Sequence, residues 1–335
     1  MKQRRIGSTE LNISEIGFGC GGNAGLMVSG EYTEQLRVIA RALECGITYF
    51  DNAPDYGAGA AEVNLGRVLK ELGADPVINT KVEIRAENLG DIAGHIERSV
   101  EESLRRLKRD AIDIVQIHNG PVAAQPHMEG KYYATLWAED YHRQGGVLEG
   151  VHALLRLGKA RHAGFVCRGD DIDEVRQLLD TGLFHMINVP YTLLNPSAGY
   201  SYSSSIGVKP DFGNVINVAK AAGCGVAVFS PLAGGVLTDA ILRGQQTHPL
   251  ARTKNIETLE ANGVLHKARK FQALARRENI ELVELAYRFI LSNASVTTLL
   301  GGITVAEQLA AAVTASIAGP LPQNLLTDIE TIRHR

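Results

Sequence analysis

The chain has 335 residues, of which 45% are hydrophobic and 21% are charged, and its formal net charge is −3. Acidic and basic residues are interspersed, so we expect no nucleic-acid or membrane partner and favour a small molecule. No apolar run approaches the ~18 residues that a membrane-spanning helix needs.

Short β-branched or apolar runs alternate along the chain with longer segments of helical period, which is the pattern of repeated βα units. One such helical segment is 96–109, where apolar residues recur at spacings of three and four. The predicted strands are 15–19, 47–51, 77–81, 112–118, 161–166, 186–191, 225–230 and 296–301. Eight parallel strands with intervening helices predict an α/β fold, a closed (β/α)8 TIM barrel that spans residues 1–335 as one domain.

The chain begins with two short extended pieces on either side of a Gly-Ser-Thr-Glu turn at residues 7–10. This pattern predicts an N-terminal β-hairpin that plugs the bottom of the barrel. The first ten residues contain no apolar signal segment, and the four cysteines lack CxxC or metal spacing. We therefore expect a reducing cytoplasm and no metal site, while the oligomeric state stays open.

Polar side chains follow three consecutive predicted strands. Asp51 ends the second strand and leads to Tyr56, Lys81 ends the third, and His118 ends the fourth. The carboxyl ends of barrel strands face a common mouth, so these four residues are expected to converge there. Each alone could be structural, as a helix cap, a packed ring or a solvated amine.

Together the four side chains suit proton transfer to an oxygen that becomes negative. A tyrosine titrates near 10 in water, and a nearby ammonium such as Lys81 lowers its pKa. Asp51 can hold Lys81 charged, and His118 can donate a hydrogen bond to a carbonyl oxygen. The combination predicts general acid catalysis with electrostatic stabilisation.

The segments "FDNAPDYGAGAAEVNLG", "NTK" and "DIVQIHNGP" resemble the aldo-keto reductase family. The likeness covers nearly the whole chain and is to bacterial, monomeric-barrel members of the aldose or pyridoxal dehydrogenase-like type. The resemblance implies a nicotinamide cofactor, NADPH or NADH, with Tyr56 as the proton donor. It further implies that Lys81 and Asp51 tune Tyr56 and that His118 orients a small-molecule carbonyl substrate.

The resemblance also implies a set of cofactor contacts. The segment "VAVFSPLAGGVLT" is similar to one that stacks a ring on the nicotinamide and lines the pyrophosphate, and "TLLGGITVAEQL" is similar to one that holds the adenosine end. Thr304 and Glu307 form a capping-box pattern at the start of the helix there. The implied contact residues are Gly19, Cys20, Asn188, Phe229, Ser230, Leu232, Gly234, Gly302, Thr304 and Gln308.

Several positions depart from the family pattern. Residues 299–312 contain no cation to meet a 2′-phosphate, so we expect NADH to be used, with comparable use of NADPH left open. Val166 and Cys167 stand where Ser-Asn is common, and Asn188 stands where Gln is common. A competing dinucleotide fingerprint at Gly19, Gly21 and Ala24 lacks an immediate helix and is the weaker alternative.

Two long segments, 119–146 and 192–214, follow strands four and six and are rich in tyrosine. They are the expected substrate loops, with Asn119 and Trp137 as candidate contacts and a cyclic or sugar-derived carbonyl as the substrate. The alternative is that 132–137 is a short helix that packs on the barrel.

Three functions are compatible with these residues. The first is carbonyl reduction, the second is NAD-dependent oxidation of a sugar, and the third is a non-catalytic, redox-sensing partner protein that binds the cofactor. The complete set of four catalytic candidates argues against the third.

Overall fold

The computed structural model describes residues 1–21, 25–127, 134–168, 171–200, 210–246, 252 and 254–334. Eight parallel strands close into a barrel in the order β3-β4-β5-β6-β9-β10-β11-β12, with β12 paired to β3. The strands are β3 (Ile16–Gly19), β4 (Tyr49–Asp51), β5 (Val77–Val82), β6 (Ile112–Ile117), β9 (Ala160–Val166), β10 (Phe184–Pro190), β11 (Gly225–Phe229) and β12 (Thr298–Gly302). Each overlaps a predicted strand, so the (β/α)8 barrel is confirmed. The competing dinucleotide fingerprint that includes Gly19 and Gly21 is wrong, because it belongs to an open sheet.

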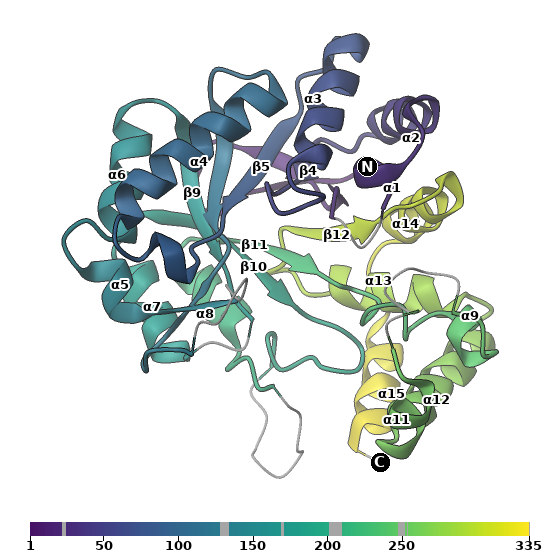
Figure 1. The fold of residues 1–335 in the computed structure, drawn as a ribbon. Coiled ribbons are helices and arrows are strands. Elements are labelled where there is room, and N and C mark those ends of the chain that lie inside the picture. Colours follow the sequence, from purple (N-terminus) through teal and green to yellow (C-terminus); the bar gives the residue numbers. More distant parts are fainter. Residues whose placement is uncertain are drawn as a thin grey trace.

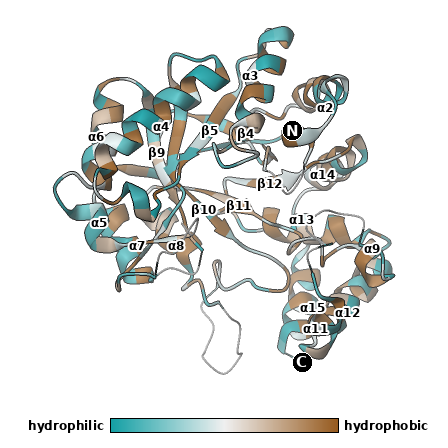
Figure 2. Ribbon diagram, viewed as in Figure 1, coloured by the Kyte–Doolittle hydropathy of each residue, from teal (hydrophilic) through white to brown (hydrophobic). Residues whose placement is uncertain are grey.

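Helices surround the barrel in Figure 1, and Figure 2 shows apolar residues concentrated on the strands and on the helix faces toward them. None of the described helices is long and apolar enough to cross a membrane. The helices are α1 (Leu26–Ser29), α2 (Tyr32–Glu44), α3 (Ala60–Leu72), the 3-10 helix η1 (Ala86–Asn88), α4 (Ile92–Leu107), α5 (Ala138–His142), α6 (Val147–Arg156), α7 (Ile172–Asp180), α8 (Val215–Ala221), α9 (Asp239–Leu242), α11 (Ile256–Ala261), α12 (Val264–Arg277), α13 (Leu282–Leu291), α14 (Ala306–Ala318) and α15 (Gln323–His334).

Helix α4 shows how local sequence sets these elements. The Asp91 carboxylate caps its start by accepting from the amide of Gly94. The apolar residues predicted to share one face, Ile96, Val100 and Leu104 among them, are buried. The helix therefore covers the outside of the barrel with one apolar stripe and exposes its charges.

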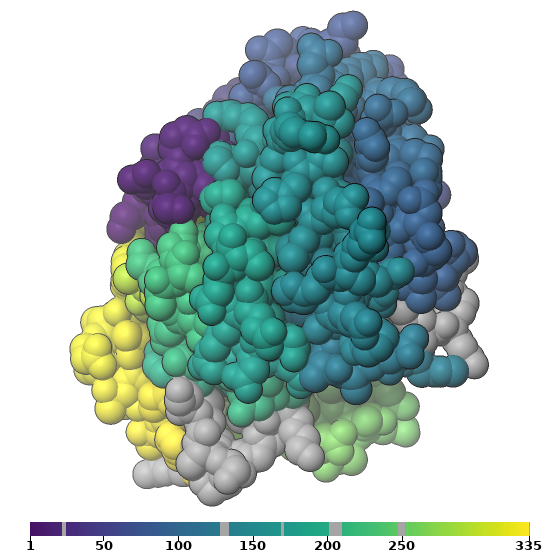
Figure 3. All heavy atoms as spheres, turned by 90° about the vertical axis from the view of Figure 1, so that its left-hand side faces the viewer, coloured from purple at the N-terminus to yellow at the C-terminus, as the bar shows by residue number. Residues whose placement is uncertain are grey.

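The N-terminal hairpin, β1 (Gln3–Arg5) and β2 (Asn12–Ser14), is present and antiparallel, as predicted. The Arg4 guanidinium donates to the buried Glu15 carboxylate at 2.8 Å and to the carbonyl of Val296 at 2.7 Å. Figure 3 shows the purple N-terminal residues against a green part of the chain, where the amide of Ser8 donates to Gly223. Apolar hairpin residues pack against strand residues inside the barrel, in the cluster Ile6, Leu11, Ile13, Tyr49, Ile114, Met186, Ala227 and Leu300.

The loop after β6 contains a two-stranded sheet of β7 (Gly120–Val122) and β8 (Thr135–Trp137). The alternative of a short helix across 132–137 is wrong for Thr135–Trp137, because these residues are extended. Tyr132 and Tyr133 lie outside the described residues, as do Tyr202 in the second loop and Ala24 of the glycine fingerprint.

Close strand packing gives a test of the barrel. Gly164 in β9 faces β10, where an added Cβ would lie 2.1 Å from the carbonyl oxygen of Met186. We expect Gly164→Ala to lower the free energy of unfolding by about 1–3 kcal/mol or more, because a backbone atom cannot move aside. Thermal unfolding should show a midpoint several degrees lower. Gly90→Ala is the control, since nothing lies within 4 Å of its added Cβ. Equal midpoints for the two variants would contradict the packing.

Candidate active site

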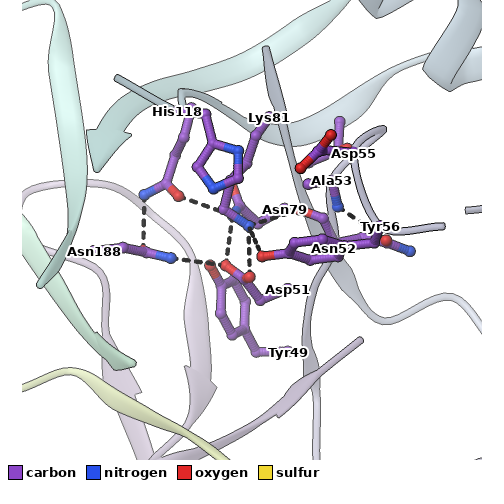
Figure 4. Close-up of polar contacts among 12 residues, drawn as sticks. Tyr49, Asp51, Asn52, Ala53, Asp55, Tyr56, Asn79, Lys81, His118 and Asn188 are labelled. Carbon is purple, nitrogen blue, oxygen red and sulfur yellow. Dashed lines mark hydrogen bonds and ion pairs between the residues drawn. The ribbon is translucent and has the colours of Figure 1, made fainter. Parts of the chain in front are cut away.

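Three of the four catalytic candidates meet around one ammonium at the carboxyl ends of β4 and β5. Lys81 Nζ donates to Asp51 Oδ1 at 2.5 Å, to the carbonyl of Asn52 at 2.7 Å and to Tyr56 Oη at 3.4 Å. Figure 4 shows this ammonium between the Asp51 carboxylate and the Tyr56 hydroxyl. The side chains of Lys81 and Asp51 are 2% and 4% exposed. The pair is therefore a buried salt bridge in contact with the phenol.

A ring of amides holds the other oxygen of Asp51. Asn79 and Asn188 each donate to Asp51 Oδ2, at 2.8 and 2.9 Å. Gln116 bridges them, since its Nε2 donates to Asn188 and its Oε1 accepts from Asn79. The sequence reasoning missed Asn79 and Gln116, although each lies two residues before a candidate and so shares its face of the strand.

Burial and the strongest neighbouring charge shift the pKa of Lys81 in opposite directions, and the same holds for the pKa of Tyr56. Burial by itself would lower the pKa of Lys81, but Asp51 and Tyr56 outweigh it and raise that pKa. Burial raises the pKa of Tyr56 more than the Lys81 ammonium lowers it. The expected lowering by Lys81 is present, but burial outweighs it, so the net pKa of Tyr56 lies above its usual value. Tyr56 is a neutral phenol near pH 7 and can donate a proton.

His118 follows β6 and has a partner at each ring nitrogen. Its Nδ1 lies 3.3 Å from Glu83 Oε1, and its Nε2 lies 2.9 Å from Arg168 Nη2. Burial, followed by the charges of Lys81 and Arg168, lowers the pKa of His118 well below 6.5. The ring is therefore neutral. The sequence reasoning missed both partners, although Glu83 lies two residues after Lys81 and Arg168 lies just after β9.

Glu83 is 8% exposed, and its Oε1 also accepts from the amide of Asp55 at 3.1 Å. Burial and the neighbouring Asp55 charge raise the pKa of Glu83 from 4.5 to about 7. Its carboxyl group therefore titrates near neutral pH, beside the imidazole.

A cavity of about 760 Å³ extends from these residues to the start of α14. Of the ten predicted cofactor residues, all of which the structure describes, Cys20 and Thr304 do not line it. Cys20 is buried, and burial raises the pKa of its thiol. Eight of the ten predicted cofactor residues do line it: Gly19, Asn188, Phe229, Ser230, Leu232, Gly234, Gly302 and Gln308.

The loop after β11 has the backbone of an anion cradle. Ser230, Ala233, Gly234 and Gly235 all have positive φ, at 52°, 50°, 67° and 90°. The amides of Ala233 and Gly235 donate to the carbonyls of Ser230 and Leu232 and so fix the turn. Turns of this kind can direct their remaining N–H groups toward an anion such as a pyrophosphate. A Cβ placed on Gly234 would lie 3.3 Å from Lys254 Nζ, so a cation also borders the cradle. The residues present fit a dinucleotide, and Lys254 was not predicted.

The start of α14, where the adenosine end of a cofactor is expected, differs from the predicted capping box. The N-cap of α14 is Val305, with no side-chain cap. Gln308 Oε1 instead accepts from the amide and the hydroxyl of Thr304, at 2.6 and 2.7 Å. The capping-box prediction is wrong because the residue that accepts from the amide of Thr304 is Gln308 and not Glu307. Glu307, in the first turn of α14, lines the cavity, as does Glu281 at the start of α13.

The two candidate substrate residues use their polar groups in hydrogen bonds within the protein. Asn119 is fully buried, and its amide group pairs with the amide and carbonyl of Ile84 at 2.9 and 2.8 Å. The indole N–H of Trp137 donates to the carbonyl of Ala123. Neither lines the cavity as far as the structure describes the chain. Both hold the β7–β8 loop in place.

The chain matches the model of the Aldo/keto reductase family over residues 15–334. L-Galactose dehydrogenase of Arabidopsis thaliana is 25% identical, over 98% of this chain and 93% of that protein. NADH-specific methylglyoxal reductase of Escherichia coli is 27% identical, over 92% and 91%. The solved aldo-keto reductase AKR11C1 from Bacillus halodurans (holo form) matches with a TM-score of 0.73 and 24% identity, over 99% of this chain and 96% of that one.

The raised pKa of Glu83 predicts a pH dependence of stability. The folded carboxyl holds its proton up to about pH 7, whereas the unfolded one releases it near 4.5. The contribution of Glu83 to the free energy of unfolding is therefore fully present below pH 4.5. It is lost as the pH rises from 4.5 through 7, by up to about 3 kcal/mol. Glu83→Gln removes this loss, so its thermal midpoint relative to wild type should rise from pH 4.5 to 7 and then level.

The control is Glu87→Gln, which changes an exposed carboxyl on η1. Its midpoint should run parallel to that of the wild type. Parallel profiles for Glu83→Gln as well would contradict the assigned pKa.

Proposed function

The chain belongs to the aldo/keto reductase family, and from that premise we propose that it reduces the carbonyl of a small aldehyde or ketone with NADH. Membership makes it an NAD(P)-dependent oxidoreductase. The observation that carries the proposal is the buried Lys81 ammonium, which contacts both Asp51 and the Tyr56 hydroxyl. A phenol beside a fixed cation is a general acid whose conjugate base is stabilised.

Bound NADH supplies a hydride to the carbonyl carbon. Tyr56 donates its hydroxyl proton to the carbonyl oxygen, and Lys81 stabilises the phenolate that remains through its hydrogen bond to Oη. Asp51 keeps Lys81 charged and fixed in position. Since Tyr56 is only half-buried, the phenolate can regain a proton from solvent at the mouth.

Two carboxylates support NADH over NADPH. Glu307, in the first turn of α14 where the adenosine is expected, lines the cavity, and so does Glu281 before α13. A carboxylate accepts hydrogen bonds from ribose hydroxyls and repels a 2′-phosphate. Lys254 borders the cradle after β11 instead, where it suits the pyrophosphate. One relative is named as an NADH-specific reductase.

The substrate class is a small polar carbonyl compound, either a short aldehyde or a sugar-derived one. The relatives named for methylglyoxal and L-galactose support this range. Trp137 and Tyr141 give no support for an aromatic cleft, because both donate their polar hydrogens to backbone carbonyls. The four free cysteines suit the reducing cytoplasm, which we propose as the location.

The second candidate is NAD-dependent oxidation of a sugar, which the L-galactose dehydrogenase relative favours. Oxidation requires Tyr56 as a base. Burial raises the pKa of Tyr56, so the phenolate is scarce near pH 7 and the phenol form, which reduction uses, dominates. The dominance of the phenol supports our proposal of reduction as the first candidate.

Tyr56→Phe tests the reaction. It deletes the acid without touching the cofactor segments, so we expect kcat to fall about 100-fold or more while the NADH dissociation constant changes less than ~3-fold. The measurements are NADH and NADPH oxidation across a panel of sugars and short aldehydes, and NADH fluorescence titration. Wild-type protein that binds NADH yet turns over nothing in either direction would support a non-catalytic partner.

Glu307→Arg tests the cofactor choice. It replaces a repelling carboxylate with a guanidinium that can pair with a 2′-phosphate, so kcat/KM for NADPH relative to NADH should rise about 10-fold or more. Fluorescence titration should show tighter NADPH binding. Glu87→Arg makes the same charge change outside the cavity and should leave the ratio unaltered. A wild type that already prefers NADPH a hundredfold would overturn the argument.

A further inference from the structure

Three charged or titratable side chains lie next to one another on neighbouring barrel strands. Glu83 follows β5, His118 follows β6 and Arg168 follows β9, and these strands are consecutive in the barrel. The imidazole is the middle member, with Glu83 at Nδ1 and Arg168 at Nε2. The position of the proton on the His118 ring therefore depends on both neighbours.

The guanidinium decides where the imidazole proton sits. A guanidinium can only donate, so Nε2 of His118 accepts from Arg168 at 2.9 Å. The single proton of the neutral ring is then on Nδ1, where it is donated to Glu83. The amide of Asp55 donates to the same Glu83 oxygen, which fixes that oxygen as an acceptor. In this arrangement His118 has no N–H left for a substrate.

Arg168 is the group of the three that a substrate meets. Its side chain is exposed, and it lines the same cavity as Tyr56 and Phe229. Its Cζ lies 5.8 Å from the Phe229 ring centroid, over the ring predicted to stack on the nicotinamide. Its charge is close enough to Tyr56 to lower the pKa of the phenol. A cation in this place favours negative charge on an oxygen beside Tyr56.

We propose that Arg168 donates the hydrogen bond to the reacting oxygen of the substrate. His118 is a positioning residue that holds the guanidinium by accepting from it, and Glu83 keeps the imidazole in the accepting tautomer. This inference rests on the proposed carbonyl reduction. The hydride pair goes to the carbonyl carbon and the proton comes from Tyr56, while Arg168 transfers nothing and stabilises the oxygen as charge develops. The role differs from the one the sequence resemblance assigns to His118.

The kinetic test compares Arg168→Met, Arg168→Lys and the control Arg176→Met, which removes an exposed arginine from α7. Loss of one oxyanion donor lowers kcat by about 100-fold, so we expect that drop for Arg168→Met, with the NADH dissociation constant within ~3-fold of wild type. Arg168→Lys should recover most of the loss because it keeps a cationic donor. Arg176→Met should match the wild type.

The pH profile separates this role from a structural one. Arg168 lowers the pKa of Tyr56, so removing its charge raises that pKa and shifts the basic limb of the kcat profile to higher pH. Arg168→Lys should leave the limb in place. An Arg168→Met enzyme with wild-type kcat and an unmoved limb, beside an inactive Tyr56→Phe enzyme, overturns the inference and leaves the proposed function standing. Absence of Tyr56-dependent turnover in the wild type overturns both.

The tautomer of His118 can be measured without turnover. In protein labelled with 15N-histidine, the assigned His118 signals should show a protonated Nδ1 and an unprotonated Nε2, with and without NADH. The His118→Gln variant supplies the assignment. A proton on Nε2 would free that nitrogen to donate to a carbonyl and would overturn the inference.

Discussion

The buried salt bridge between Lys81 and Asp51 is the interaction on which the site depends. Both side chains are almost fully buried, and loss of one partner from such a pair costs about 3–5 kcal/mol because the other charge is left uncompensated. In the intact pair, Asn79 and Asn188 donate hydrogen bonds to the Asp51 carboxylate, and Gln116 connects these two amides. These bonds offset part of the cost of burying the carboxylate. The fixed ammonium is then available to the Tyr56 hydroxyl.

The barrel makes that arrangement possible because its strands are parallel and adjacent. Side chains two residues apart on one strand share a face, so each strand contributes a supporting residue below its reactive one: Asn79 below Lys81, and Gln116 below His118. The hairpin residues fill the opposite end with apolar side chains. Polar chemistry is thereby confined to the carboxyl end of the barrel.

Charged side chains of both signs line the cavity. Asp51, Asp55, Lys81 and Arg168 line it together with Tyr56, and Lys254 borders the loop after β11. Glu281 and Glu307 line it as well, Glu307 from the first turn of α14. The cations suit the pyrophosphate and the developing oxyanion of the proposed reaction, and a carboxylate at the start of α14 suits a ribose without a 2′-phosphate.

The barrel, the hairpin and the convergence of Asp51, Tyr56 and Lys81 could be predicted from the amino-acid sequence. These follow from local hydrophobic period and from strand ends that topology places at one mouth. The position of the imidazole proton, the net direction of the Tyr56 pKa shift, the burial of Asn119 and the hydrogen bonds of Gln308 to Thr304 became clear only from the folded chain. Each depends on which side chains from different strands or turns come within hydrogen-bond distance and on how far burial excludes water. The spacing of residues along the chain gives neither the contacts nor the burial.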